Sequence, residues 1–502
     1  MKILIKNGKI HDGTGAPWYR ADVLVDDGKI IAVGKLADLS VDELIDAEGL
    51  AVAPGFIDAH SHTDIFCLPD PDGKIIQGVT TEIAGMCGLS PFPLEGFLGK
   101  NNLATDLAIA VGQGKIHEKA MGLVNRDPTP DELSLMKDML RESMELGAIG
   151  LSSGLIYAPG CFTKTGELIE LCRVVEEYGG VYVSHIRNEA DDLAASVGEA
   201  LAIGRESGCK VQISHHKASG KQNHGKVAQT LEMMEKAREE GIDVCCDAYP
   251  YIAGSSPIDT LLPDWAHEGG MDELLGRLRD KGARQRIKED IINGLPGWED
   301  MCKNSGWDGV LVCGAPENEE LEGKNLQEIG ELLGKEPADA LLDLILDEEG
   351  AGMIAHFGAC EEDNNYVLRH RLTMIGSDGW GLPCAPGGSM GKPHPRCYGT
   401  FPRVLGRCCR ELKLFPLETA IMKMTGFVAA RYRLDDRGFL MTGKKADIVV
   451  FDPDTISDHI SYVEPWAAPD GIRYVIKNGE IAVEGKRYLR KKLGRVLTGH
   501  AR

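Results

Sequence analysis

The stretch Gly55-Phe-Ile-Asp-Ala-His-Ser-His-Thr-Asp64 is a short apolar run that ends in two histidines one residue apart. Side chains alternate between the two sides of a strand, so His60 and His62 point to the same side and can meet one metal ion. A single His-x-His is a modest signal, because two polar residues at the start of a loop give the same pattern. The signal strengthens when other apolar runs of the chain end in a similar way.

Short apolar runs alternate with amphipathic helices through the middle of the chain. Thr129-Pro-Asp-Glu132 has an N-cap residue, a proline at the first helical position and a glutamate at the third, which predicts a helix start. Val227, Leu231 and Met234 recur at helical spacing and predict another helix. With a run ending near Ile57, we expect eight strands, the others being Thr81–Gly85, Ala148–Ser152, Gly180–Ser184, Lys210–Ser214, Ile242–Cys246, Gly352–Ala355 and Leu372–Ser377. Eight strands, each but the last followed by a crossover, predict an α/β fold of the (β/α)8 TIM-like barrel type.

Both ends of the chain predict β structure. Asn-Gly or Asp-Gly lies between strand-like runs in Lys2–Ile10, Val23–Gly34 and Tyr474–Val483, and Ala446–Asp452 is a further strand-like run. Such dipeptides between β-rich runs are a hairpin signal. Two β segments at opposite ends of a chain most simply form one small sheet domain.

These patterns predict how the chain is divided. We expect a β-sandwich built from residues 1–52 and 440–502, and a barrel of residues 53–439 between them. The stretch from about 257 to 350 is too long for one barrel crossover, and its pattern is charged and helical. We interpret it as an insertion positioned to cover the barrel mouth.

Composition limits the classes of partner. The formal net charge is −22 over 502 residues, which argues against nucleic acid or an anionic membrane, because these need a basic surface. No stretch approaches the roughly 18 apolar residues of a membrane span, and the first residues lack the apolar core of a signal peptide. We therefore expect a cytoplasmic protein that acts on a small molecule, with most of its 14 cysteines reduced. The sequence carries no signal for the oligomeric state.

Metal-binding residue types recur where the predicted barrel strands end, which is where a barrel builds its active site. A lone histidine there is more often a hydrogen-bonded polar residue, and a lone cysteine is more often a buried apolar one. Zinc accepts imidazole, thiolate and carboxylate ligands, and a catalytic zinc site keeps one position for water. Six candidates on five strand ends together favour a zinc site: His60, His62, Cys87, His185, His215 and Asp378.

These residues resemble the amidohydrolase superfamily, and over essentially its whole length the sequence is similar to the D-aminoacylase (N-acyl-D-amino-acid deacylase) family. The most specific segments are Gly85-Met-Cys-Gly-Leu-Ser90 and Gly391–Gly406, which contains Lys-Pro-His-Pro-Arg-Cys-Tyr-Gly. The other resembling segments are Gly13–Asp22, Gly55–His62, Gly150–Gly160, Ser184–Glu189, Ile213–Lys217 and Asp247–Ser255. The resemblance implies zinc-dependent hydrolysis of the acyl amide bond of N-acyl-D-amino acids, with dipeptides that end in a D-residue as further candidates.

The resemblance also implies a role for each residue. Cys87, His185 and His215 would hold a tightly bound zinc ion, whereas His60, His62 and Asp378 would line a second, weaker site. Asp378 would also be the general base that passes a proton to the leaving nitrogen. The residues that would hold the substrate carboxylate are Tyr157, Lys217, Tyr249, Ser255 and Arg396. Without the resemblance, the tyrosines would be read as half-buried aromatic residues and Arg396 as part of a surface ion pair.

Two features bear on the substrate side chain. Members that take acidic D-residues would be expected to carry an arginine in the insertion, but no lysine or arginine lies between Ser255 and Arg277. Asp259, Asp264 and Leu261-Leu-Pro-Asp-Trp265 lie there instead, which favours a neutral or apolar side chain. Gln113 occupies a position where relatives often carry histidine.

Two other functions stay open. A cyclic amidase of the hydantoinase or dihydropyrimidinase type usually depends on a carbamylated lysine between two metal ions, but here Cys87 takes the bridging position and no lysine precedes His185 on its predicted strand. A catalytically inactive barrel that serves as an interaction scaffold would tend to lose metal ligands, whereas all six candidates are present.

Overall fold

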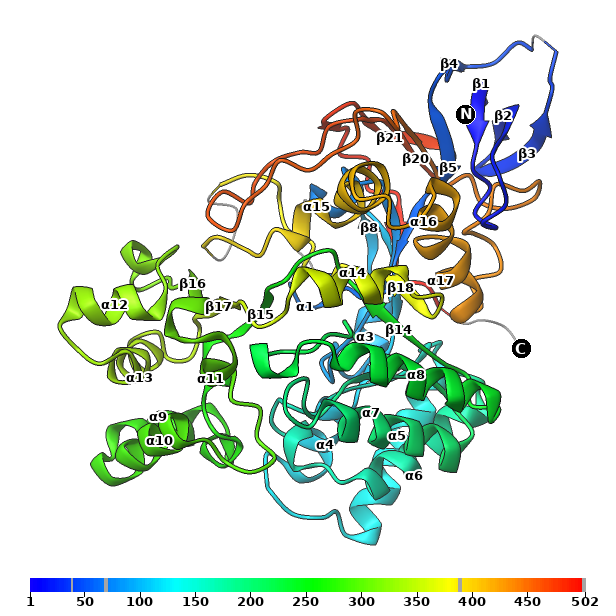
Figure 1. Cartoon of the computed structure of the whole chain (residues 1–502). Coiled ribbons are helices and arrows are strands. Elements are labelled where there is room, and N and C mark those ends of the chain that lie inside the picture. The colour runs from blue at the N-terminus through cyan, green and yellow to red at the C-terminus, as the bar shows by residue number, and fades with distance from the viewer. Residues whose placement is uncertain (38, 67–70, 387–390, 499–502) are drawn as a thin grey trace.

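The computed structural model describes residues 1–37, 39–66, 71–386 and 391–498, and a ring of parallel strands lies at its centre (Figure 1). Within these residues, eight strand segments follow one another around the ring: β6 (Phe56–Asp58), β7 (Val79–Ala84), β9 continued by β10 (Asp106–Ile109 and Val111–Gly112), β11 (Gly150–Gly154), β12 (Val181–His185), β13 (Lys210–Ile213), β14 (Val244–Ala248) and β18 (Thr373–Ile375). A parallel bridge between Ser61 and Gly379 joins the last strand to the first. The predicted (β/α)8 barrel is confirmed.

The predicted set of strands contains one omission and one false member. The third barrel strand, Asp106–Gly112, is missing from the prediction, although Leu107-Ala-Ile-Ala-Val111 is a continuous apolar run. The predicted strand Gly352–Ala355 is wrong as a barrel strand, since β17 (Met353–His356) pairs antiparallel with two strands of the insertion. A four-residue apolar run does not reveal its pairing partner. His185 is therefore the last residue of the fifth barrel strand and His215 follows the sixth, each one strand later than predicted.

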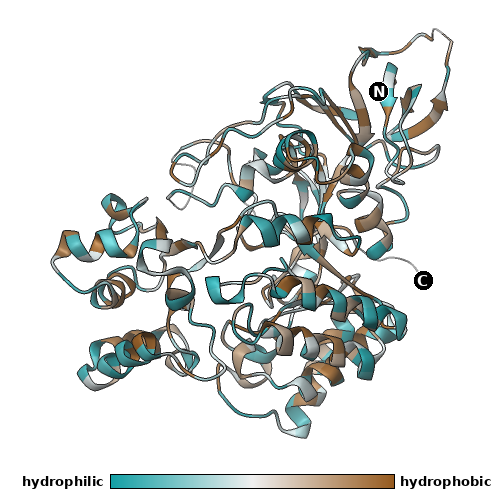
Figure 2. Ribbon diagram, in the orientation of Figure 1, coloured by the Kyte–Doolittle hydropathy of each residue, from teal (hydrophilic) through white to brown (hydrophobic). Residues whose placement is uncertain are grey.

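Helices cover the outside of the ring. In chain order they are α1 (Thr63–Phe66), α2 (Asp72–Ile75), α3 (Glu95–Leu98), α4 (Gln113–Met121), α5 (Pro130–Glu145), α6 (Thr165–Glu177), α7 (Leu193–Ser207), α8 (Lys226–Glu239), α14 (Glu361–Arg369), α15 (Arg396–Arg403) with its π-helical continuation Val404–Glu411, α16 (Leu417–Lys423) and α17 (Gly426–Arg431). The helices carry both hydrophilic and hydrophobic residues (Figure 2), as expected when one face packs on the barrel. Among the described residues, none of the helices has both the length and the apolar content that crossing a bilayer requires.

Both helix predictions from local signals are confirmed. The Thr129 hydroxyl accepts a hydrogen bond from the backbone N–H of Glu132 at 3.3 Å, and the Glu132 carboxylate accepts one from the Thr129 N–H at 2.7 Å, so the capping box at the start of α5 is complete. Val227, Leu231 and Met234 are buried on α8.

Strands from both ends of the chain form one nine-stranded sheet, as predicted. Its order is β22-β21-β20-β19-β5-β1-β2-β3, with β4 beside β1. The strands are β1 (Ile3–Ile10), β2 (Tyr19–Asp26), β3 (Lys29–Gly34), β4 (Glu43–Asp46), β5 (Ala51–Pro54), β19 (Ile448–Phe451), β20 (Ile472–Lys477), β21 (Glu480–Glu484) and β22 (Arg487–Tyr488). A second terminal contact pairs β23 (Gly494–Arg495) with β8 (Asn101–Leu103). The predicted limits of the domains stay a prediction.

Two of the three dipeptide signals mark hairpins. Asp27-Gly28 joins β2 to β3 and Asn478-Gly479 joins β20 to β21. The hairpin predicted at Asn7-Gly8 is wrong, because β1 runs straight through it. Asn7 has a φ of 64°, and the pairing register with β2 shifts at this point, so the dipeptide forms a bulge instead of a turn.

The insertion has its own sheet and apolar core. Its sheet is antiparallel and contains β15 (Gly254–Pro257), β17 and β16 (Val310–Gly314). Its helices lie beside the barrel in Figure 1 and are α9 (Met271–Arg279), α10 (Lys281–Asn293), α11 (Met301–Ser305), α12 (Leu326–Leu333) and α13 (Pro337–Asp347). Leu274, Ile329, Leu341 and Ile354 belong to a buried cluster of the insertion.

A buried ionic cluster joins the barrel to the terminal sheet. The carboxylate of Asp106 on β9 lies 2.7 Å from Nζ of Lys477 on β20 and 2.6 Å from Nη1 of Arg437. Asp447 completes the cluster at 3.0 Å from Lys477. Burial alone would raise the pKa of Asp106, but the two cations outweigh it and hold the pKa below its ordinary value.

Removing one member of this cluster should destabilise the protein strongly. Asp106→Asn removes a negative charge that two buried cations, Lys477 and Arg437, share. We therefore expect the free energy of unfolding to fall by on the order of 3–5 kcal/mol. Urea denaturation measures the change. Glu118→Gln removes the partner of Lys115 in a solvent-exposed ion pair and should cost less than about 1 kcal/mol. Equal denaturation midpoints for the two variants would contradict the role of the cluster.

Candidate metal centre

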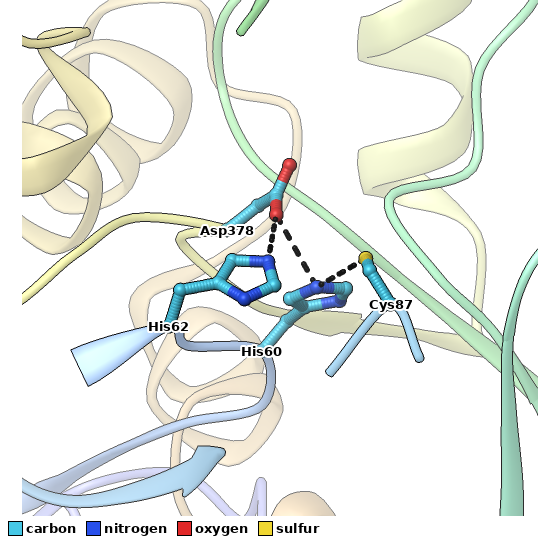
Figure 3. Close-up of side chains that lie close together, drawn as sticks. All are labelled: His60, His62, Cys87 and Asp378. Carbon is cyan, nitrogen blue, oxygen red and sulfur yellow. Dashed lines mark hydrogen bonds and ion pairs between the residues drawn. The ribbon is translucent and has the colours of Figure 1, made fainter. Parts of the chain in front are cut away.

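The six predicted metal ligands meet at the carboxyl end of the barrel. They fall into two overlapping groups, and the ligand atoms within each group lie within 4.8 Å of one another. Figure 3 shows the side chains of the first group pointing toward one another. The first group is His60, His62, Cys87 and Asp378, and the second is Cys87, His185 and His215. Cys87 is common to both groups.

The distances around Cys87 suit a zinc ion. Its Sγ lies 3.7 Å from Nδ1 of His185, 3.7 Å from Nε2 of His215 and 3.4 Å from Nε2 of His60. Usual Zn–S and Zn–N lengths in a tetrahedral site separate a sulfur from a nitrogen ligand by about 3.5 Å. One thiolate and two imidazoles at this spacing therefore fit three zinc ligands, with a fourth position left over.

Asp378 connects the first group to Arg396. Its Oδ1 lies 3.0 Å from Nε2 of His62 and 3.2 Å from Nε2 of His60, while its Oδ2 forms an ion pair with Nη1 of Arg396 at 2.7 Å. Asp378 and Arg396 are both buried. A single carboxylate thus contacts the candidate second metal group on one side and a cation on the other.

Electrostatics keep both acids in their metal-binding forms. Burial opposes ionisation of the Cys87 thiol, but the charge of His60 and hydrogen bonds with His185 and His215 outweigh it and hold the pKa of Cys87 well below its ordinary value. Burial likewise opposes ionisation of Asp378, yet Arg396 and the neighbouring histidines hold its pKa well below the ordinary range. Both shifts favour the thiolate form of Cys87 and the carboxylate form of Asp378, which are the forms that bind metal ions.

The backbone is strained at three of the candidate ligands. Cys87, His215 and Asp378 have φ values of 54°, 32° and 52°, in the left-handed region that non-glycine residues avoid. Each such residue costs on the order of 1 kcal/mol or more and persists where its surroundings require it. All three follow the ends of barrel strands, where the turn of the backbone brings their ligand atoms into one centre.

Glu189 is a site residue to which the sequence analysis gives no role. Its Oε1 lies 3.0 Å from Nδ1 of His215, and both of its oxygens accept hydrogen bonds from Nζ of Lys217 at 2.7 Å. A carboxylate behind a metal-binding histidine fixes which ring nitrogen carries the proton. Its position four residues after His185, in a loop that follows a barrel strand, is the signal that could have identified it.

The predicted carboxylate-binding residues lie around Tyr249. The guanidinium of Arg396 lies 5.0 Å from the centre of the Tyr249 ring, and Nζ of Lys217 lies 5.8 Å from it. The Tyr249 hydroxyl is buried and has no hydrogen-bond partner among the described residues. This places a free hydroxyl near two cations.

The other two predicted contacts are also near the centre. The ring of Tyr157 lies edge-on to His185 with the ring centres 5.1 Å apart. Ser255 belongs to β15 of the insertion, and its backbone carbonyl accepts a hydrogen bond from Nη2 of Arg396 at 3.2 Å. Gln113, in contrast, donates to Thr163 and Glu167 at 2.9 Å each, which ties α4 to α6 and to the turn before α6.

A cavity extends from Asp378 and Arg396 toward the insertion. Its lining includes Cys313, Met353 and Trp380, besides Ser255. The side chains that surround a ligand here would come partly from the barrel and partly from the insertion.

Comparisons with known proteins agree with this geometry. A model of the amidohydrolase family matches residues 43–153 and 366–483. The chain is 36% identical to D-aminoacylase of Alcaligenes xylosoxydans xylosoxydans over 99% of this chain and 97% of that protein. The crystal structure of N-acyl-D-glutamate deacylase from Bordetella bronchiseptica, complexed with zinc and a phosphonate inhibitor that mimics the tetrahedral intermediate, superposes with a TM-score of 0.83 at 33% identity and covers 99% of both chains.

A second solved structure is a D-aminoacylase with a binuclear metal centre, described by one-metal activation and second-metal attenuation. It superposes with a TM-score of 0.81 at 34% identity and covers 98% of this chain and 99% of that one. Full-length identity of this level, together with the converging thiolate, imidazole and carboxylate groups, places the chain in one family. It belongs to the D-aminoacylase (N-acyl-D-amino-acid deacylase) family of metal-dependent amidohydrolases.

Proposed function

We propose that the protein hydrolyses the acyl amide bond of N-acyl-D-amino acids that have a neutral or apolar side chain. The observation that carries this proposal is the carboxylate of Asp378, which contacts the histidines of the metal centre through one oxygen and Arg396 through the other. This arrangement links the place where the amide bond reacts to the place where a substrate carboxylate binds.

Zinc is the cofactor that fits the donor set, with Cys87, His185 and His215 as ligands of the tightly bound ion. His60, His62 and Asp378 are the ligands of a weaker second site. A bound zinc ion supplies Lewis acidity, which makes water nucleophilic near neutral pH and polarises the amide carbonyl.

Asp378 is the general base in this proposal. It takes the proton from the attacking water and delivers it to the amide nitrogen, which must be protonated before it can leave. Without substrate, the ion pair with Arg396 depresses the basicity of Asp378. A substrate carboxylate that binds Arg396 draws this cation away, so substrate binding itself raises the basicity of Asp378.

The substrate carboxylate is held by Arg396, Lys217 and the free hydroxyl of Tyr249, and Tyr157 and Ser255 complete the wall of the site. The guanidinium can bind a carboxylate through two hydrogen bonds. Fixing the carboxylate at Arg396 and the acyl carbon beside Cys87 leaves one direction for the side chain at Cα, so the site selects one hand of the substrate.

The side-chain preference rests on the cavity beside Arg396. Its described lining includes the polar residues Asp378, His394 and Arg396 at one side, whereas Cys313, Met353 and Trp380 are apolar or aromatic. Arg396 is proposed to bind the substrate carboxylate, so an acidic side chain would need a second cation. The described lining contains no other arginine or lysine. The cavity therefore suits apolar groups.

The cyclic amidase has less support. Its carbamylated lysine would lie on the fourth barrel strand, and that strand reads Gly150-Leu-Ser-Ser-Gly154. Cys87 provides the ligand that can be shared by two metal groups. An inactive scaffold has no need for three strained backbone positions around such a centre.

Paired N-acetyl-D- and N-acetyl-L-amino acids test the proposed activity directly. With zinc-replete protein, we expect hydrolysis of the D series, and higher kcat/KM for N-acetyl-D-leucine or N-acetyl-D-methionine than for N-acetyl-D-glutamate. Initial rates of amine release measure both. Zinc-replete protein that hydrolyses neither hand would refute the deacylase proposal, and a preference for the glutamate derivative would refute the side-chain assignment alone.

Substitution of Cys87 tests the proposed tight zinc site. Cys87→Ala removes the ligand common to both groups, so we expect loss of bound zinc and at least about a 100-fold fall in kcat/KM. Elemental analysis after dialysis measures the zinc. Cys409→Ala, at a half-buried cysteine whose Sγ contacts Phe415, should retain zinc and activity. Full zinc content in Cys87→Ala would show that the ion binds elsewhere.

Arg396→Gln tests the carboxylate clamp. We expect about a 100- to 1000-fold lower kcat/KM for N-acetyl-D-leucine, the cost of losing a buried charge pair, with zinc retained. N-acetyl-D-leucine amide, which lacks the carboxylate, should lose much less on the same substitution. Arg407→Gln, in an exposed ion pair with Glu361, is the control. An equal loss for both substrates would mean that Arg396 does not bind the carboxylate.

A further inference from the structure

A chain of buried polar groups runs through the barrel interior to the metal centre. The hydroxyl of Tyr432 donates a hydrogen bond to Oε1 of Gln212 at 2.6 Å, and Nε2 of Gln212 donates to Oδ2 of Asp247 at 2.7 Å. Oδ1 of Asp247 lies 3.2 Å from Nδ1 of His60 as a close ion pair. Gln212, Asp247 and His60 are fully buried, and Tyr432 is 3% exposed.

The chain begins at the amino end of the strands and ends at the carboxyl end. Tyr432 lines a cavity together with Ile149 and Val181, which lie at the start of β11 and β12. Gln212 and Asp247 lie on the neighbouring strands β13 and β14. An amide and a carboxylate in a barrel interior that is usually filled by branched apolar residues are costly unless each is hydrogen-bonded. The hydrogen bonds from Tyr432 to Gln212 and from Gln212 to Asp247 offset this cost of burial.

The two nitrogens of His60 face different partners. Its Nε2 lies 3.4 Å from Sγ of Cys87 and 3.2 Å from Oδ1 of Asp378, so it is the nitrogen available to a metal ion. Its Nδ1 faces Asp247. A neutral imidazole that binds a metal through Nε2 must carry its proton on Nδ1, and a carboxylate beside Nδ1 favours that tautomer. Neither Nδ1 of His60 nor Nδ1 of His62 forms an aligned hydrogen bond with the described residues, but Nδ1 of His60 has the Asp247 carboxylate at ion-pair distance.

The orientation of Asp247 depends on groups other than His60. Besides the bond from Gln212, Oδ1 of Asp247 accepts the backbone N–H of His215 at 2.8 Å. The Asp247 carboxylate only accepts hydrogen bonds, so Gln212 must turn its NH2 group toward it and its Oε1 toward Tyr432. The Tyr432 hydroxyl supplies the donor that Oε1 then needs, and it thereby holds Gln212 in place against Asp247.

We propose that Tyr432, Gln212 and Asp247 are positioning residues that set the orientation and tautomer of His60, and thereby the affinity of the second metal site. This inference rests on the metal assignment made above. Tyr432 itself touches neither the substrate-binding residues nor the ligands of the tight site in the contacts described. Asp247 meets the tight site through the backbone N–H of His215 and not through a ligand atom, so we expect the larger effect at the second site. The affinity of the first site is the internal reference.

Tyr432→Phe is the sharpest test because it removes one oxygen atom and keeps the ring. Tyr182→Phe is the matched control: Tyr182 is also a buried tyrosine, but its hydroxyl contacts Ser153 and Ser184. Metal-depleted wild type and both variants are dialysed against buffers of graded free zinc, and bound zinc per chain is measured. Thermal unfolding of the three metal-depleted proteins verifies that they are folded.

The wild type should bind zinc in two separate steps. Tyr432→Phe should leave the first step unchanged and shift the second to about 10-fold higher free zinc or more, the usual effect of removing a group behind a metal ligand. Tyr182→Phe should match the wild type in both steps. The inference is overturned if the second step of Tyr432→Phe lies within twofold of the wild type, if both steps shift equally, or if wild type shows only the first step. A wild type that binds no zinc in either step refutes the proposed metal centre itself.

Discussion

A buried thiolate needs nearby positive charge or a metal ion, and this requirement at Cys87 organises the centre of the molecule. Burial alone would keep the thiol protonated, yet three histidines lie within 3.4–3.7 Å of its sulfur. Those histidines come from three different barrel strands, so the electrostatic requirement can be met only when the ring closes. The strained φ values of Cys87, His215 and Asp378 indicate that bringing the ligand atoms together costs the folded state some stability.

Charge connects this centre to the rest of the site in two directions. On one side Asp378 leads to Arg396, where the substrate carboxylate is proposed to bind, and on the other Glu189 pairs with both His215 and Lys217. The insertion contacts both groups of residues. The Ser255 carbonyl accepts a hydrogen bond from Arg396, and the Glu299 carboxylate accepts one from the backbone N–H of Glu189 at 2.5 Å. A change of the insertion therefore affects substrate-binding groups and metal-orienting groups together.

The sequence predicts the barrel and its ligands better than it predicts the details that support them. Strand-end residues such as His60 and His62 are visible because side chains alternate along a strand. The buried acid at the start of the strand Asp106–Gly112 is not predictable, because its partners Arg437 and Lys477 lie more than 300 residues away in the chain. Asp247 and Gln212 carry no local signal either, since a buried polar residue looks like a surface one until its partners are known. The bulge at Asn7 shows the same limit, because one dipeptide serves both a turn and a bulge.

X-ray absorption at the zinc edge, measured on protein loaded with one zinc ion per chain, tests the central claim most directly. The account predicts one sulfur ligand at about 2.3 Å and two imidazole nitrogens at about 2.0–2.1 Å, with oxygen completing the shell. A zinc ion with no sulfur ligand, or with two, would contradict a centre built on Cys87, His185 and His215.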